Sequence, residues 1–151
     1  MNKMDSPASV FELWLLTGKA QHSIMLVRQR EIRKYPIPIH HSHILYTIQA
    51  LGSKATLFEV AKEVERAVHV ISRQAVILEG EGLIKRIRIS PSSKLLRLEL
   101  TKKGFDVIKV AKDSKSIATI FSCLSKEERE QLESISKKLL IQSKNYTSLE
   151  F

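Results

Sequence analysis

The sequence predicts a mainly α-helical fold that contains one small β-hairpin. Apolar residues recur at helical spacing along most of the 151 residues, and only 5 Gly and 4 Pro interrupt them. The spacing changes from helical to alternating between residues 84 and 100. A chain of this length that is 43% apolar can bury a core. We therefore expect residues 1–151 to form a single domain with six helices.

A long first helix is predicted from residue 9 to about residue 34. Ser9 and Glu12 have the S-x-x-E spacing of a capping box, just before an apolar run. Pro36 and Pro38 prevent the helix from continuing past Tyr35. Its apolar side is wider than a small domain needs, which indicates that a partner chain covers it. That side is formed by Phe11, Trp14, Ile24 and Val27.

Two short helices are predicted next. Ser42 is placed to cap the first, whose apolar residues repeat at helical spacing over Leu45–Leu51. Gly52 suits its C-terminal end. A second capping box, Thr56–Glu59, opens the other helix, which we expect to end near Val64.

A fourth helix is predicted from about Ala67 to Glu79. At about 100° per residue, His69 and Arg73 point away from one narrow apolar arc. We expect this arc to face the core and the opposite face to be free for another role. The arc consists of Val68, Ile71, Ala75 and Leu78. Glycines at positions 80 and 82 end the helix.

A β-hairpin is predicted directly after these glycines. Its strands cover residues 84–89 and 95–100, and the turn is Ser90-Pro91-Ser92-Ser93. In the first strand Ile87 and Ile89 alternate with Arg86 and Arg88. Leucines at 96, 98 and 100 alternate with Leu95, Arg97 and Glu99 in the second strand. The pattern predicts one apolar face and one basic rim.

Two further helices are predicted to close the chain. Thr101 begins the first, with Phe105, Ile108, Ala111, Ala118 and Phe121 on its inner side. A third capping box, Ser125 with Glu128, opens the second, which carries Leu132, Ile135 and Leu139 to about Ser143. We expect residues 144–151 to fray. The wide apolar faces predict that residues 9–34 and 105–143 are dimerisation helices.

Charge indicates the kind of partner. The formal net charge is +9, which favours an anionic partner such as nucleic acid or an acidic membrane surface. Residues 65–104 hold nine Lys and Arg against four Asp and Glu, a net +5. This segment includes the second helix of a tight helix-turn-helix and the basic hairpin that follows it, the arrangement of a winged helix. The second helix of such a unit fits the DNA major groove.

The motifs in this region resemble those of the MarR family of transcription regulators. They are Thr56-Leu57-Phe58-Glu59-Val60-Ala61, Val70-Ile71-Ser72-Arg73, Leu78-Glu79-Gly80-Glu81-Gly82-Leu83-Ile84-Lys85-Arg86 and Leu100-Thr101-Lys102-Lys103-Gly104. The resemblance implies a triangular homodimer whose two DNA-binding lobes, residues 42–104, dock on a pseudo-palindromic operator. It also implies repression of a neighbouring operon, with release by a small-molecule effector.

One departure from the family pattern concerns the wing. The family's wing carries Asp-x-Arg about nine residues before the Thr of Leu-Thr-x-x-Gly, and that register falls on Ser92 and Lys94. Lysine keeps the positive charge but lacks the planar fork of arginine. We therefore expect the wing to contact phosphates rather than to read the minor groove.

Ten residues are expected to contact DNA. Arg73 and His69 would read base edges from the exposed face of the fourth helix. Phosphates or flanking bases are assigned to Arg66, Ser72 and Gln74, and Val70 is expected among the DNA contacts on the same helix. Contacts from the wing are assigned to Arg86, Arg88, Lys94 and Arg97.

Other features leave alternatives open. His40, His41 and His43 could bind a metal, but residues 101–121 offer no His or Cys as further ligands. They could equally lie in a polar loop or line an effector cleft. Cys123 could be a redox switch or a small buried residue. The aromatic residues that could contact a lipophilic effector, or pack in the core, are Trp14, Tyr35 and Tyr46.

No catalytic motif is recognisable, so we expect neither an enzyme nor a cofactor. The polar N-terminus, the single cysteine and the lack of a long apolar run favour the cytoplasm. The rival function is a winged-helix module that binds proteins and not DNA.

Overall fold

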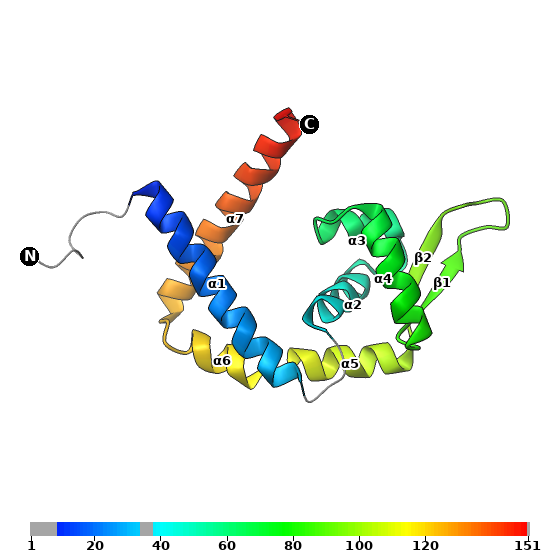
Figure 1. Cartoon of the computed structure of the whole chain (residues 1–151), viewed down its shortest axis with the longest axis horizontal. Coiled ribbons are helices and arrows are strands. Elements are labelled where there is room, and N and C mark those ends of the chain that lie inside the picture. Colours follow the sequence, from blue (N-terminus) through cyan, green and yellow to red (C-terminus); the bar gives the residue numbers. More distant parts are fainter. Residues whose placement is uncertain (1–8, 34–37, 151) are drawn as a thin grey trace, which may run out of the picture. The chain divides into compact units, whose positions relative to one another are not determined.

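The computed structural model describes residues 9–33 and 38–150 (Figure 1). The chain divides into two compact units, residues 1–114 and residues 115–151. The first contains α1 (Val10–Ile32), α2 (Ile39–Leu51), the 3-10 turn η1 (Gly52–Lys54), α3 (Leu57–Glu63), α4 (Val68–Gly80), β1 (Ile84–Arg88), β2 (Leu96–Leu100) and α5 (Lys102–Lys112). The second contains α6 (Lys115–Phe121) and α7 (Lys126–Glu150).

Side-chain caps begin several helices where the sequence predicts them. Ser9 and Glu12 form both bonds of a capping box at the start of α1. The Glu59 N–H donates to the Thr56 hydroxyl over 3.2 Å at the start of α3. At α7, Ser125–Glu128 completes the third box, with N–H donors in both directions at 2.8 and 3.2 Å. These bonds satisfy N–H groups that have no partner inside the helix.

Three predicted helix boundaries are wrong. The second helix begins at Ile39 rather than near Ser42, because the Pro38 carbonyl already accepts N–H bonds from His41 and Ser42. The helix predicted from Thr101 to Phe121 is divided at Asp113–Ser114 into α5 and α6. If α5 and α6 are counted as one interrupted helix, the described residues contain the six α-helices that the sequence predicts. The tail does not fray, since α7 continues to Glu150 without a Gly or Pro to stop it.

The break between α5 and α6 combines helix-breaking residues with contacts to α1. Asp and Ser compete with a helix by bonding backbone and side-chain groups in non-helical conformations. The Ser114 hydroxyl donates to a carboxylate oxygen of Glu31 on α1 over 2.8 Å. The guanidinium of Arg28, also on α1, donates to the Ala111 carbonyl at the last turn of α5. The end of α5 is thus held by polar contacts to α1.

The core of the first unit lies between α2, α3, α4, α5 and the hairpin root. Leu45, Leu78 and Leu98 are fully buried. Three members of the arc predicted on the fourth helix are buried, namely Ile71, Ala75 and Leu78. The fourth, Val68, is the first residue of α4 and is 42% exposed. No helix in residues 9–33 and 38–150 is long and apolar enough to span a membrane.

The hairpin does not have the two uniform faces that the sequence predicts. Strand β1 pairs antiparallel with β2 so that Ile84 lies opposite Leu100 and Arg86 opposite Leu98. Ile87 lies opposite Arg97 on the other face. Opposed residues share a face, so each face mixes apolar and basic side chains. Only the root of the hairpin is buried; Ile89, just past β1, is 51% exposed.

A tight corner joins α4, the hairpin and α5. Thr101 caps α5 and also binds the α4–β1 loop: its N–H donates to the Leu83 carbonyl over 3.0 Å. The Thr101 hydroxyl donates to the Gly82 carbonyl over 2.6 Å. Gly82 has a φ of +73°, which favours glycine. Gly104 is buried against Leu83, and a Cβ there would overlap the Leu83 carbonyl oxygen.

The Gly104→Ala substitution is therefore expected to lower the free energy of unfolding by about 1–3 kcal/mol, because backbone must move to admit the methyl group. Thermal or urea unfolding monitored by circular dichroism measures this loss. Gly80→Ala is the matched control, since nothing lies within 4 Å of a Cβ at Gly80. Equal stability of the two variants would contradict the proposed packing constraint.

Candidate nucleic-acid interface

Helix α4 presents a solvent-exposed face opposite its buried arc. His69 and Arg73 are exposed, whereas Ile71 and Ala75 are buried. Val70 and Ser72 are half-buried at the flanks. The structure thus places His69 and Arg73 together on one accessible face, as the sequence predicts.

The turn between α3 and α4 holds this face in position. Glu65 has a φ of +53°, in the left-handed region that residues other than glycine adopt infrequently. The Arg66 N–H donates to the Ala61 carbonyl over 3.0 Å, which closes the turn. Arg66 itself is exposed at the start of α4. Burial lowers the pKa of His40, and the electrostatic influence of the neighbouring His41 and Arg66 lowers it further.

Gln74 faces α2 instead of joining the exposed face. Its Oε1 lies 2.6 Å from Nε2 of His41, and Gln74 is half-buried. The sequence predicts a DNA contact for Gln74, whereas in the structure its amide oxygen is bonded to His41 inside the fold. His41 is only 4% exposed, and the signal for its burial was present in the sequence. It precedes Leu45 by four residues and Ile48 by seven, which places all three on one helix face.

Two of the four predicted wing contacts form ion pairs within the chain. Arg86 donates to Glu79 through its backbone N–H at 3.0 Å and its Nε at 2.7 Å. Both hydrogen bonds lower the pKa of Glu79, and the bond from the Arg86 backbone has the larger effect. Arg97 pairs with Glu99. Arg88 and Lys94 are exposed near the tip of the wing.

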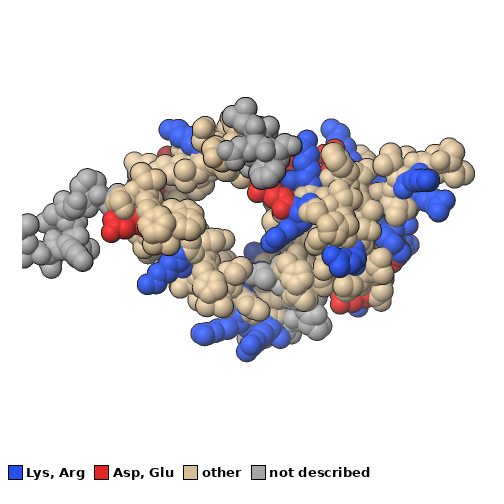
Figure 2. Space-filling model, turned by 45° about the horizontal axis from the view of Figure 1, so that its top comes forward, with Lys and Arg blue, Asp and Glu red and all other residues tan. Residues whose placement is uncertain are grey.

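Lys85 and Glu79 are functional candidates that the sequence analysis missed. Lys85 is exposed on β1, and Glu79 ties the end of α4 to the wing. The turn predicted at Gly80 and Gly82 is a signal in the sequence for this contact, because it brings Glu79, just before the turn, close to the strand that follows it. Figure 2 shows Lys and Arg side chains projecting from the lobe that carries the wing, with fewer Asp and Glu between them on that face.

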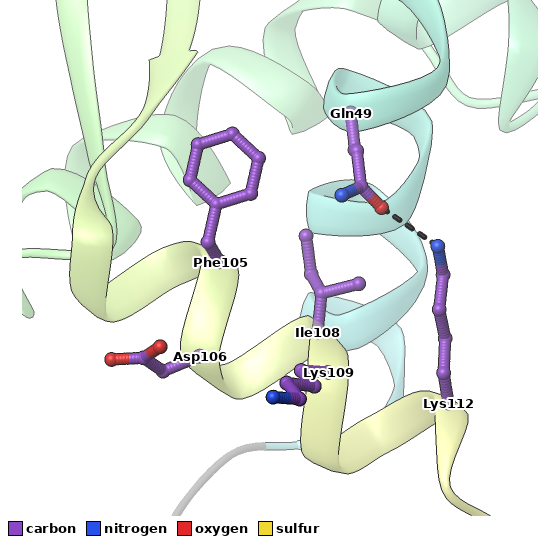
Figure 3. Close-up of a pocket in the computed structure, with 6 residues that line it drawn as sticks. All are labelled: Gln49, Phe105, Asp106, Ile108, Lys109 and Lys112. Atoms are coloured by element: carbon purple, nitrogen blue, oxygen red, sulfur yellow. Dashed lines mark hydrogen bonds between the residues drawn. The ribbon is translucent and has the colours of Figure 1, made fainter.

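A groove of about 320 Å³ lies between α2 and α5 (Figure 3). It is lined by Gln49, Phe105, Asp106, Ile108, Lys109 and Lys112. The Lys112 ammonium donates to the Gln49 amide oxygen over 2.9 Å and lies 5.0 Å from the ring centre of Tyr46. Phe105, expected on the inner side of its helix, is 49% exposed here. The groove combines an aromatic ring with two cations.

The residues considered for metal binding, redox sensing and effector binding can now be placed in the structure. Among the described residues no three His, Cys, Asp or Glu side chains are close enough to hold a metal ion. Cys123 is exposed in the turn between α6 and α7, so the interpretation as a buried residue is wrong. Trp14 is exposed on α1 with its ring centre 5.6 Å from that of Phe11. Tyr35 lies outside the described residues.

Comparison with known proteins gives matches among solved structures. Neither a protein-family model nor a curated protein sequence matches the chain. The ligand-free organohalide-sensing RdhR regulator superposes with a TM-score of 0.79 at 20% identity, over 97% of this chain and 92% of that one. A MarR-family protein from Bacillus stearothermophilus superposes with a TM-score of 0.72 at 22% sequence identity, over 95% of this chain and 99% of that one. The chain has the MarR fold.

A further structure with the MarR fold was solved with DNA. The MepR–DNA complex from S. aureus superposes with a TM-score of 0.70 at 25% identity, over 85% of this chain and 95% of that one. The fold class expected from the sequence is confirmed. Within it, α3 and α4 form the helix-turn-helix, and β1 with β2 forms the wing.

Arg73→Ala is expected to weaken binding to a specific duplex by about 1–3 kcal/mol and to relax discrimination at one base pair, because Arg73 is exposed on α4. Fluorescence anisotropy with the preferred duplex and its single-base variants measures both effects. Arg129→Ala, which removes an exposed arginine from α7, is the control for loss of charge. Unchanged binding by Arg73→Ala would show that another face reads DNA.

Lys94→Ala is expected to weaken binding to all duplexes about equally, since an ammonium near the wing tip suits phosphate contact. The slope of log affinity against log salt should fall in magnitude by about one. Binding titrations at several salt concentrations give this slope. A loss confined to one sequence would instead indicate that the wing reads bases.

Proposed function

We propose that the protein is a homodimeric MarR-type transcription regulator, not an enzyme, that binds a pseudo-palindromic DNA site. The observation that carries this proposal is the face of α4, where His69 and Arg73 are exposed opposite a buried apolar arc. An α-helix with such a face fits the major groove. The MarR fold, shared with a protein solved in complex with DNA, supports the same function.

The test is selection of a preferred duplex from a random pool, followed by gel shift at two salt concentrations. We expect a strong preference for one sequence with two-fold symmetry, and affinity that falls as salt rises. Binding that is equal for all duplexes, or absent, would favour the rival function of a protein-binding module. Measuring expression of the adjoining genes with and without the protein tests the proposed repression of a neighbouring operon.

Two long helices each expose an apolar face that a second copy of the chain would cover. On α1, Phe11 and Trp14 are each 65% exposed. On α7, Ile135 and Leu139 are 54% and 60% exposed. Exposed apolar area of this extent marks an interaction surface. The proposed occupant is the same pair of helices from a second protomer, which supports a symmetric dimer.

Light scattering at micromolar concentration should therefore report a dimer, with an interface above about 2,000 Å² in total. Combining Ile135→Glu with Leu139→Glu is expected to yield monomers, because both carboxylates would be buried without partners. Lys137→Glu changes the opposite side of α7 and serves as the control. A monomeric wild type would contradict the dimer.

We propose that a lipophilic small molecule regulates DNA binding from the groove between α2 and α5. Phe105 and Ile108 offer apolar contacts, and Lys109 and Lys112 offer positive charge. The related RdhR structure was solved with 2,4-dichlorophenol bound, so this compound is a suitable probe. It should release the selected duplex from the wild type at lower concentration than from Phe105→Ala. Equal release from both proteins would show that the compound does not act from this groove.

A further inference from the structure

One buried polar contact joins α2 to the DNA-facing helix α4. His41, in the first turn of α2, is 4% exposed, and its Nε2 lies 2.6 Å from Oε1 of Gln74. An amide oxygen can only accept, so the His41 Nε2–H is the donor. The other ring nitrogen, Nδ1, is buried, and no hydrogen-bond partner for it exists among the described residues.

This contact is a poor means of stabilising the core. A buried nitrogen without a partner costs more free energy than one ordinary hydrogen bond returns. An apolar side chain of similar size would fill the site without that cost. What the hydrogen bond adds is direction, because its strength depends on distance and angle. This directional constraint adds to the apolar packing of Ile71, Ala75 and Leu78 on the same helix.

Direction matters here because Gln74 directly follows Arg73. A rotation of α4 by about 10° would displace the ends of its side chains by about 1 Å, at a side-chain radius of about 6 Å. Recognition of base edges tolerates errors of only about 0.5 Å. Fixing the Gln74 amide therefore limits where the Arg73 guanidinium can lie.

We propose that His41 is a positioning residue for sequence recognition: through Gln74 it fixes the rotation of α4 without touching DNA. The proposal rests on the proposed function, since it concerns discrimination by the same helix. It separates two properties that a DNA-binding helix needs. Charge on α4 and the wing gives affinity for any duplex, and the His41–Gln74 bond sharpens the preference for one.

The test is the ratio of affinities for the selected duplex and a scrambled one, measured by anisotropy below the unfolding temperature of every variant. In His41→Leu and in Gln74→Leu this ratio should fall about five- to 100-fold, with affinity for the scrambled duplex unchanged. The double variant should lose no more than either single one, because one bond is removed in all three. His41→Gln, whose amide can still donate, should recover part of the ratio.

His43→Leu is the matched control, since His43 is exposed two residues away on the same helix, and its ratio should equal that of the wild type. A wild type that binds both duplexes equally would overturn the proposed function. A selective wild type whose His41→Leu variant keeps its ratio would overturn the role of His41 alone. Additive losses in the double variant would also overturn it, because they would mean that the two residues act separately.

Discussion

The close approach of α5 to the loop after α4 is the constraint on which the rest of the winged helix-turn-helix lobe depends. Gly104 lies against the backbone of Leu83, and Thr101 binds both Gly82 and Leu83. The end of α4, the root of the hairpin and the start of α5 therefore meet at one point. Because a side chain at position 104 would separate them, the motif Leu-Thr-x-x-Gly is explained by packing and not by contact with DNA.

Charge in this lobe has two distinct uses. Arg86 and Arg97 are paired with Glu79 and Glu99, so their guanidinium groups hold the wing to α4 or stiffen it. The other cations of the wing, Arg88 and Lys94, are exposed to solvent. A count of basic residues along the sequence mixes the two groups, and only the structure separates them. The net charge of residues 65–104 is the same whether the two ion pairs are counted or left out, because each pair is neutral.

Features fixed by neighbouring residues were predictable from the sequence, and features fixed by distant contacts were not. The capping boxes at Ser9 and Ser125 and the stop at Gly52 depend on local hydrogen bonds or backbone conformation. The inward turn of Gln74 depends on His41, which is 33 residues away. The mixed hairpin faces depend on register, which alternation within one strand does not determine. The α5–α6 break likewise depends on contacts to α1.

The left-handed conformation of Glu65 bears on how such a lobe can move. A residue other than glycine keeps a positive φ only where the surrounding structure imposes it, and here the bonds from Glu65 to Lys62 and from Arg66 to Ala61 do so. A turn constrained in this way is a poor hinge. Helices α3 and α4 are therefore expected to move as one rigid body, so that the angle between them stays fixed when the lobe as a whole changes position.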